Sequence, residues 1–356
     1  MRKSVTAVVL ALGRYAVLPV VAVAAVLLAA WLAALDDHPV LVLAAAPVVL
    51  PLATCAVALA IGLLLLPARR HDNPAVDESS APGLWAIWNA FDRTLPRSRR
   101  TLLIDREVNA SIAERKRFAG LFRRELTMTF GLPLLILLDE RAVRAIVAHE
   151  VTHATLQHTS GSANLAEFMA AAENIFDHAD PDNTITGRIV YVLLHALLDW
   201  LHKEYRVLSR RNELEADRDA AGWVGRDEMA RALVLAEALG DRVVETVFKP
   251  LEKEVLGAIR APAPPLQRII TRLASIRAEP IDGAALAAKP AEPDEKSTHP
   301  PLRARLANLG FADIPSIDVP KTSAADTVLA ADTLTQLVAR FDDEWSRRVN
   351  EHIGIY

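Results

Sequence analysis

Length, composition and charge limit what this chain can be. Its 356 residues suffice for one medium-sized domain with extensions, or for two small domains. The formal net charge of −4 gives no indication of a nucleic-acid partner. The single cysteine, Cys55, excludes an intrachain disulfide and a thiolate metal cage. Hydrophobic residues make up 52% of the chain, which is high for a soluble protein, and the excess lies at the N-terminus.

Two long apolar runs lie near the start of the chain. Residues 15–35 and 39–67 contain no charged side chain. Each run reaches the roughly 20 apolar residues that a helix needs to cross the hydrocarbon core of a bilayer. A signal peptide has a shorter apolar core, of about 7–15 residues, and is not followed by a second run. The sequence therefore predicts a two-helix transmembrane hairpin over residues 1–67, with a soluble hydrophobic hairpin as the alternative.

Basic residues flank this hairpin on one side only. Arg2 and Lys3 precede the first run, and Arg69 and Arg70 follow the second. The turn 36–38 between the runs holds two aspartates and neither Lys nor Arg. Because cytoplasmic flanks are enriched in Lys and Arg, both ends and the remaining body are predicted to be cytoplasmic. We expect an integral protein of a bacterial-type inner membrane, with the lipid bilayer as a partner.

Residues 68–98 read as a linker of charged residues, Pro, Ser and Gly, followed by a short juxtamembrane helix. That helix, over 84–93, is amphipathic, and Trp85 and Trp88 lie three residues apart on one face. Two roles are open for this pair. The indole rings could contact the membrane surface, or they could pack on the domain that follows.

The rest of the chain predicts a mainly α, or α+β, body. Residues 101–105 and 132–138 are apolar runs of strand length, and residues 140–158 have the apolar spacing of a helix. The polar region 159–186 is expected to be a loop or lid. Further helices are expected at 187–223, 226–256, 264–277 and 324–350, with a linker rich in Ala and Pro at 278–301.

The helix expected at 140–158 carries the pattern His-Glu-x-x-His. His149 and His153 are four residues apart and project from one face, so two imidazoles can bind one metal ion. Glu150 is turned about 100° away, where it can reach a water molecule on the metal but cannot be a third ligand in the same plane. Two buried histidines beside a glutamate would be costly without a metal. The pattern predicts a zinc site, and ordinary core or surface histidines are the alternative.

A catalytic zinc ion needs a third protein ligand and one open position. The candidates lie in 209–221, where Glu213 and Asp217 are four residues apart, as are Glu215 and Asp219. Either pair could provide one ligand and one supporting carboxylate on a single helical face. The spacing does not choose between the pairs, and a solvated charged face is the alternative for the whole segment.

Taken together, these segments resemble a known family. The apolar hairpin, "HEVTH" and "SRRNELEAD" resemble the HtpX-type membrane metallopeptidases and the related CAAX prenyl endopeptidases. The resemblance implies a zincin-type metallopeptidase domain with a small sheet over 99–310, followed by a C-terminal helical extension over 311–356. It also implies that Glu213 is the third zinc ligand and that Asp217 supports a ligand histidine. "NAS", residues 109–111, resembles the segment that precedes the edge strand in such proteins.

The segment 297–309, "STHPPLRARLANL", resembles one in which a histidine and an arginine approach the active site. These residues would be His299 and Arg305, which are candidates for stabilising an oxyanion. The resemblance implies a zinc-dependent endopeptidase with one Zn2+ per chain, protein or peptide substrates, and a role in membrane-protein quality control. Glu150 would be the general base, and strand 132–138 the edge to which substrate adds. A membrane-anchored zinc-binding protein without proteolytic activity, acting in binding or assembly, is the alternative.

Overall fold

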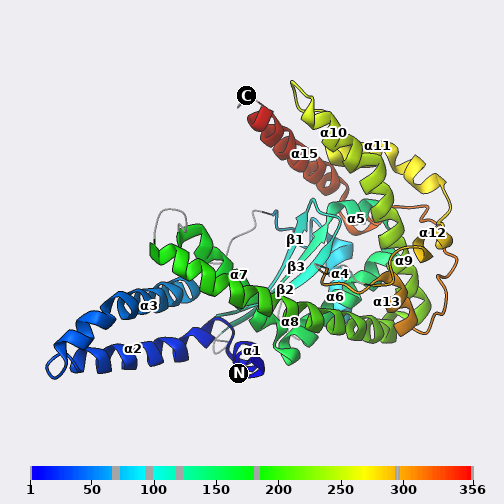
Figure 1. Ribbon diagram of the computed structural model, residues 1–356. Helices are drawn as coiled ribbons and strands as arrows, with labels where there is room; N and C mark the ends of the chain where they lie inside the picture. Colours follow the sequence, from blue (N-terminus) through cyan, green and yellow to red (C-terminus); the bar gives the residue numbers. More distant parts are fainter. Residues whose placement is uncertain are drawn as a thin grey trace. The chain divides into compact units, whose positions relative to one another are not determined.

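The structure is a computed structural model, and Figure 1 labels its elements. The chain divides into two compact units: a first unit of Met1–His71 with Gln157–Arg210, and a second unit of Asp72–Leu156 with Arg211–Tyr356. Both units are mainly helical, and the second also contains a small sheet, as expected. The residues described are 2–65, 73–92, 99–117, 123–179, 185–292, 295 and 297–353.

Helices are the only regular elements among the described residues of the first unit. Its elements are α1 (Arg2–Leu12), the 3-10 turn η1 (Gly13–Ala16), α2 (Val17–Ala33), α3 (Pro39–Leu65), α7 (Ser162–Ala179) and the start of α8 (Ile185–Val224). One described stretch, Thr6–Ala33, is long and apolar enough to cross a membrane. The apolar stretch identified in α3, Pro39–Leu50, is shorter than a span. The first expected span therefore has the required length, and the second, which extends to residue 67 beyond the described part, stays a prediction.

Helix α7 corrects the expectation of a loop or lid at 159–186. Although the segment has polar ends, its middle, Ser162–Ala179, is rich in alanine and other good helix formers. It also places apolar residues at the i, i+3, i+4 and i+7 positions of one helical face. These residues are buried in the core of the first unit: Leu165, Phe168, Met169 and Ala172.

Polar contacts fix α7 on the bend between α1 and α2. The Asn164 amide donates to the Leu10 carbonyl oxygen (2.8 Å), and Arg14 pairs with Glu167 at 3.3 Å. Gly161 is required for this close approach, because a Cβ there would lie 2.6 Å from the Leu10 carbonyl oxygen. The segment that follows the His-Glu-x-x-His helix is thus part of the packed first unit.

The second unit is built on a three-stranded sheet of β1 (Arg100–Asp105), β2 (Ala110–Arg117) and β3 (Arg123–Gly131). The central β3 pairs in parallel with β1 and antiparallel with β2. Backbone hydrogen bonds from residues 74–76 cover the outer edge of β1. Among the described residues, no strand pairs with the outer edge of β2. Among the described strands, the edge without a strand partner is therefore that of β2.

The strand expected at 132–138 is wrong: this run forms the short helix α5 (Leu132–Leu137). Gly131 ends β3 at a point where a Cβ would lie 1.9 Å from the Glu107 carbonyl oxygen. Pro133 then stands in the first turn of α5, where its fixed φ and missing N–H suit a helix start. All six residues of α5 are buried, so the apolar run carried no periodicity that could distinguish a helix from a strand.

The other expected helices are present in the structure. Trp85 and Trp88 are buried and stacked on each other, with ring centroids 5.2 Å apart, so this pair packs on the domain.

The helices of the second unit, besides α5, are α4 (Pro82–Phe91), α6 (Glu140–Ser160, which ends in the first unit), the C-terminal part of α8, α9 (Arg226–Val243), the π-helical turn Val244–Phe248, α10 (Lys249–Leu256), α11 (Pro265–Ala278), α12 (Gly283–Ala287), α13 (Leu302–Asn308), α14 (Ala325–Val328) and α15 (Ala331–Ile353).

The C-terminal segment from residue 311, expected to be a helical extension, packs into the same core. Val328, Leu337 and Phe341 are buried in the hydrophobic core of the second unit. The Asp342 carboxylate accepts hydrogen bonds from the backbone N–H groups of Leu266 and Gln267 and thus caps the start of α11. Residues beyond 311 therefore help to hold the second unit together.

Candidate metal centre

Helix α6 brings the His-Glu-x-x-His pattern into the second unit. It starts after Asp139, whose carboxylate accepts a hydrogen bond from the backbone N–H of Ala142 (3.0 Å) and pairs with Arg231. Burial alone would raise the pKa of Asp139, but the hydrogen bonds from Arg231 and the Ala142 N–H, together with the charges of Arg231 and Arg141, outweigh it and lower that pKa. The apolar face of α6 is buried in the core, including Val143 and Val147. The helix that carries the histidines is thus held at its first turn and along its length.

Three expected ligands meet in the second unit. The Nε2 atom of His153 lies 2.9 Å from Glu213 Oε1, and the Nε2 atom of His149 lies 3.6 Å from Glu213 Oε2. One ligand atom from each residue falls within 4.8 Å of the others, as a single metal ion requires. All three side chains are buried. Glu215, which the spacing left open as an alternative, is not in this group.

Asp217 lies behind the first histidine. Its carboxylate is fully buried, and its Oδ1 atom lies 3.0 Å from His149 Nδ1. A hydrogen bond at Nδ1 orients the ring and leaves Nε2 as the lone-pair donor towards a metal. This position matches the supporting role that the resemblance implies for Asp217.

Helix α13 brings the segment with His299 and Arg305 to the same place. The Arg305 guanidinium donates from Nε to Asp217 Oδ2 (2.8 Å) and from Nη2 to Asp217 Oδ1 (2.7 Å). Its Nη2 atom is also 3.3 Å from Glu213 Oε2. His299 Nδ1 lies 3.1 Å from that same oxygen, while 59% of its side chain is exposed. Both residues reach the centre from a distant part of the sequence, and Arg305 holds Asp217 through two hydrogen bonds.

The pKa values of the ionisable side chains in this group are shifted strongly. Burial alone would raise the pKa of Glu213, but the adjacent imidazoles of His149 and His153 lower it. Burial alone would lower the pKa of His149, yet hydrogen bonds to Asp217 and Glu213 raise it to about 9. Burial raises the pKa of Glu150. In the metal-free centre the protonated His149 ring and the Arg305 guanidinium offset the charges of Glu213 and Asp217, and a divalent cation that displaces the His149 proton would take over that ring's share.

The chemistry of the donor set fits zinc. His153 Nε2 and Glu213 Oε2 are buried, and neither has a hydrogen bond of normal geometry with the described residues. Two imidazole nitrogens and one carboxylate oxygen form a common ligand set of catalytic zinc, which leaves one position open. A cation at this point would provide both buried atoms with a partner.

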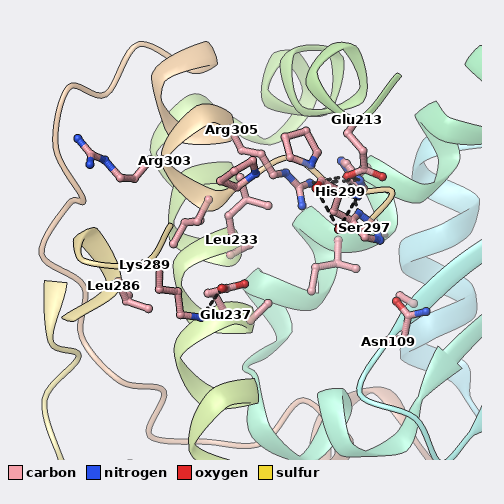
Figure 2. Close-up of a pocket in the computed structure, with 18 of the residues that line it drawn as sticks. Asn109, Glu213, Leu233, Glu237, Leu286, Lys289, Ser297, His299, Arg303 and Arg305 are labelled. Atoms are coloured by element: carbon pink, nitrogen blue, oxygen red, sulfur yellow. Dashed lines mark hydrogen bonds and ion pairs between the residues drawn. The ribbon is translucent and has the colours of Figure 1, made fainter. Parts of the chain in front are cut away.

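The group opens onto a cavity of about 550 Å³. Figure 2 shows Glu213 and His299 at one end of this cavity. Glu150 lines it beside His149, and Asn109 and Ala110 line it from the start of β2. Sequence reasoning missed a further wall formed by α9. The apolar spacing of α9 indicated a core helix but could not indicate that one of its faces borders a cavity.

Comparisons with known proteins agree with this geometry. The model for peptidase family M48 matches residues 105–311, which is more than half of the chain. The described metal group and the helices that carry it lie within this match. The chain therefore belongs to peptidase family M48.

Among solved structures, the chain is similar to the crystal structure of S. mikatae Ste24p. The two share 16% sequence identity, with a TM-score of 0.35, over 81% of this chain and 62% of that chain. The chain thus spans somewhat less than two thirds of the length of Ste24p.

Proposed function

We propose that this protein is a zinc-dependent endopeptidase that hydrolyses protein or peptide substrates. The observation that carries the proposal is the group of His149, His153 and Glu213, which opens onto the cavity beside Glu150. A purely structural zinc site has four protein ligands and no cavity. Three ligands next to a carboxylate and a cavity instead favour hydrolysis over a binding or assembly role without catalysis.

Zinc in this centre would polarise the scissile carbonyl and make a water molecule acidic enough to attack near neutral pH. Glu150 is positioned beside the ligands to accept the proton of that water and to pass it to the leaving amine. Burial raises the pKa of Glu150, and a more basic carboxylate is a better proton acceptor. His299, exposed at the cavity, is positioned to donate to the negative charge that develops on the carbonyl oxygen.

Arg305 is better suited to a positioning role than to direct contact with substrate. It is mostly buried, and two of its N–H groups are already used by Asp217. By fixing Asp217, it fixes the ring of His149. Its Nη2 atom, near Glu213, also offsets part of the negative charge of the centre. We therefore assign Arg305 mainly to holding Asp217 and His149 in position, and only secondarily to the oxyanion role that the resemblance implied.

We assign substrate pairing to β2 in place of the 132–138 segment. In the described residues, the outer edge of β2 has no strand partner, so its N–H and C=O groups are available to an extended peptide. Asn109 and Ala110, at the start of β2, line the cavity. A peptide paired with this edge would place a carbonyl group beside the metal ligands.

The N-terminal helices support membrane attachment. Thr6–Ala33 is long and apolar enough to span, and basic residues flank the hairpin on one side. We propose two spans with the second unit in the cytoplasm of a bacterial-type cell, where such a peptidase would act on membrane proteins in quality control. A substrate in the bilayer or at its surface would reach a peptidase held there more often than one free in solution.

The test is hydrolysis of unfolded casein by the purified full chain. We expect cleavage that a chelator abolishes and that zinc restores. Glu150→Gln should keep one zinc ion per chain and lose at least about 10²-fold in rate, because the proton acceptor is removed while the ligands remain. Glu215→Gln, a carboxylate on α8 outside the group, is the matched control and should cleave normally. A Glu150→Gln protein as active as the wild type would refute this mechanism.

A further inference from the structure

The cavity beside the metal group has a second part that the proposed chemistry does not use. Figure 2 shows Leu233, Leu286, Lys289 and Glu237 together on one side of the cavity, away from Glu213 and His299. The lining changes from polar residues at the metal ligands to apolar residues, and then to a charged pair at the far end. We call this region, away from the metal ligands, the distal pocket.

One face of α9 forms the first wall of the distal pocket. Its lining residues follow the i, i+3, i+4, i+7 and i+8 spacing of a single helical face. Three of them, Met229, Ala232 and Leu233, are also part of the buried core, so the wall is fixed in place. Because Ala232 and Ala236 are small, they leave room that larger side chains would fill. The full set is Met229, Ala232, Leu233, Ala236 and Glu237.

The facing wall is also apolar. Leu286 of α12 is buried in the core, and Leu302 of α13 packs against the core from a half-buried position. Val108 and Ile146 also line the cavity. A side chain that enters here would touch carbon atoms on both sides, and each buried CH2 group would contribute favourable transfer free energy.

The far end of the distal pocket carries charged side chains that form ion pairs with one another. Lys289 forms ion pairs with Glu237 and Asp241 of α9. With two carboxylates around it, the Lys289 ammonium offers no unbalanced positive charge to a substrate. These ion pairs also hold the segment after α12 against α9, and so they set the depth of the pocket.

We propose that the distal pocket binds the substrate side chain next to the scissile bond and selects a bulky apolar residue: Leu, Met or Phe. The proposal rests on the peptidase function proposed above. The apolar walls favour such a side chain by the area that it removes from water. A charged side chain would lose its hydration between these apolar walls. An acidic side chain would in addition meet the excess negative charge of Glu237 and Asp241 around Lys289. Because a single missing methylene changes kcat/KM by roughly 10–200-fold, Leu should exceed Ala by at least about tenfold.

The test is a set of peptides that differ only in the residues flanking the cleavable bond, with Gly, Ala, Leu, Met, Phe, Asp and Lys at those positions. Cleavage products identify the preferred side of the bond. Ala236→Leu should fill the pocket and lower kcat/KM for the Leu and Phe peptides at least about tenfold, while the Ala peptide changes by less than about threefold. Ala339→Leu, at an exposed position of α15, is the matched control and should leave all rates unchanged.

Binding provides a second readout that does not depend on turnover. Fluorescent peptides of the same set are titrated onto Glu150→Gln, with and without Ala236→Leu, and zinc content and thermal stability are recorded for each variant. The proposal predicts tighter binding of the Leu and Phe peptides, and loss of this preference with Ala236→Leu. Equal binding of all peptides, or a preference for Asp or Lys, would overturn it. Cleavage without side-chain preference would overturn only the distal-pocket assignment, whereas no cleavage of any peptide would overturn the proposed function.

Discussion

Two regions of the molecule differ in opposite ways from the usual pattern of buried apolar and exposed charged side chains. They are the metal group of the second unit and the apolar helices of the first unit. In the metal group, Glu213 and Asp217 have exposed fractions of only 4% and 0%. On the apolar helices, Val26 and Leu27 have exposed fractions of 67% and 64%. Buried carboxylates and exposed aliphatic side chains are both costly in water. For each region we therefore propose a partner from outside the chain: a cation for the first and lipid for the second.

The difference shows how much structure each partner requires. A cation needs donors at fixed distances, and these come from α6 and α8 and are supported from α13. Lipid needs only a long apolar surface, which a single stretch such as Thr6–Ala33 already provides. The metal group should therefore be sensitive to single conservative substitutions, whereas the apolar helices should tolerate any apolar replacement and fail only with charge.

The largest effect is expected from a charge on the apolar surface. Leu27→Arg places a guanidinium in the middle of the proposed span, which costs roughly 2.5–3.5 kcal/mol of insertion free energy. This corresponds to an approximately 100-fold shift in an insertion equilibrium, measured as membrane-bound against soluble protein after fractionation. Leu27→Phe is the control and should stay in the membrane. Equal membrane retention of the two variants would mean that this helix does not depend on lipid.

The next largest effect is expected when the carboxylate that supports His149 is removed. Asp217→Asn keeps the shape of the side chain but removes the charge that holds the imidazole and Arg305. Loss of such a partner typically weakens metal binding by about 10–100-fold. Zinc affinity by competition with a chelating dye measures this loss. Asp219→Asn, exposed on the same helix, is the control, and an equal effect of both would show that only net charge matters.

Zinc affinity should also depend on pH. In the metal-free centre, hydrogen bonds to Asp217 and Glu213 raise the pKa of His149 to about 9 against the opposing effect of burial. Below that pH the imidazole carries a proton that zinc must displace, so affinity rises with pH by up to about tenfold per unit and levels off above pH 9. Titrations between pH 6.5 and 8.5 test this. Affinity that is constant over the range would mean that the ring is already neutral.

The smallest effect is expected where α7 meets the bend after α1. Arg14 and Glu167 form an ion pair, but both side chains are partly exposed. Such a pair contributes about 0–1 kcal/mol. Glu167→Gln should therefore lower thermal stability slightly and leave zinc content unchanged. Loss of zinc in this variant would show that the first unit controls the metal group.

The metal ligands on α6 could be predicted because their geometry is local. A four-residue spacing on a helix places His149 and His153 on one face, whatever the rest of the fold does. Glu213 could not be chosen over Glu215 from spacing, because the choice depends on how α8 is rotated about its axis. That rotation is set by packing in the core, where Ala216 and Ala220 are buried. His299 and Arg305 could be placed near the centre only by family resemblance.

The errors in the fold have a similar cause. Residues 132–138 are apolar at every position, and a completely buried segment shows no period. Residues 162–179 do have a helical period, but polar residues on both sides, at 159–160 and 180–184, concealed it. In both segments the outcome depended on tertiary burial, which the local sequence expresses weakly.

The measurement that tests the central claim most directly is the zinc content of Glu213→Ala compared with Glu215→Ala. Both substitutions remove one carboxylate from α8, two residues apart, and alanine suits the helix equally well at either position. Only Glu213 belongs to the group with the two histidines. We predict that Glu213→Ala purifies without zinc and that Glu215→Ala retains one zinc ion per chain. Full zinc in Glu213→Ala, or loss of zinc only in Glu215→Ala, would contradict the metal centre described here.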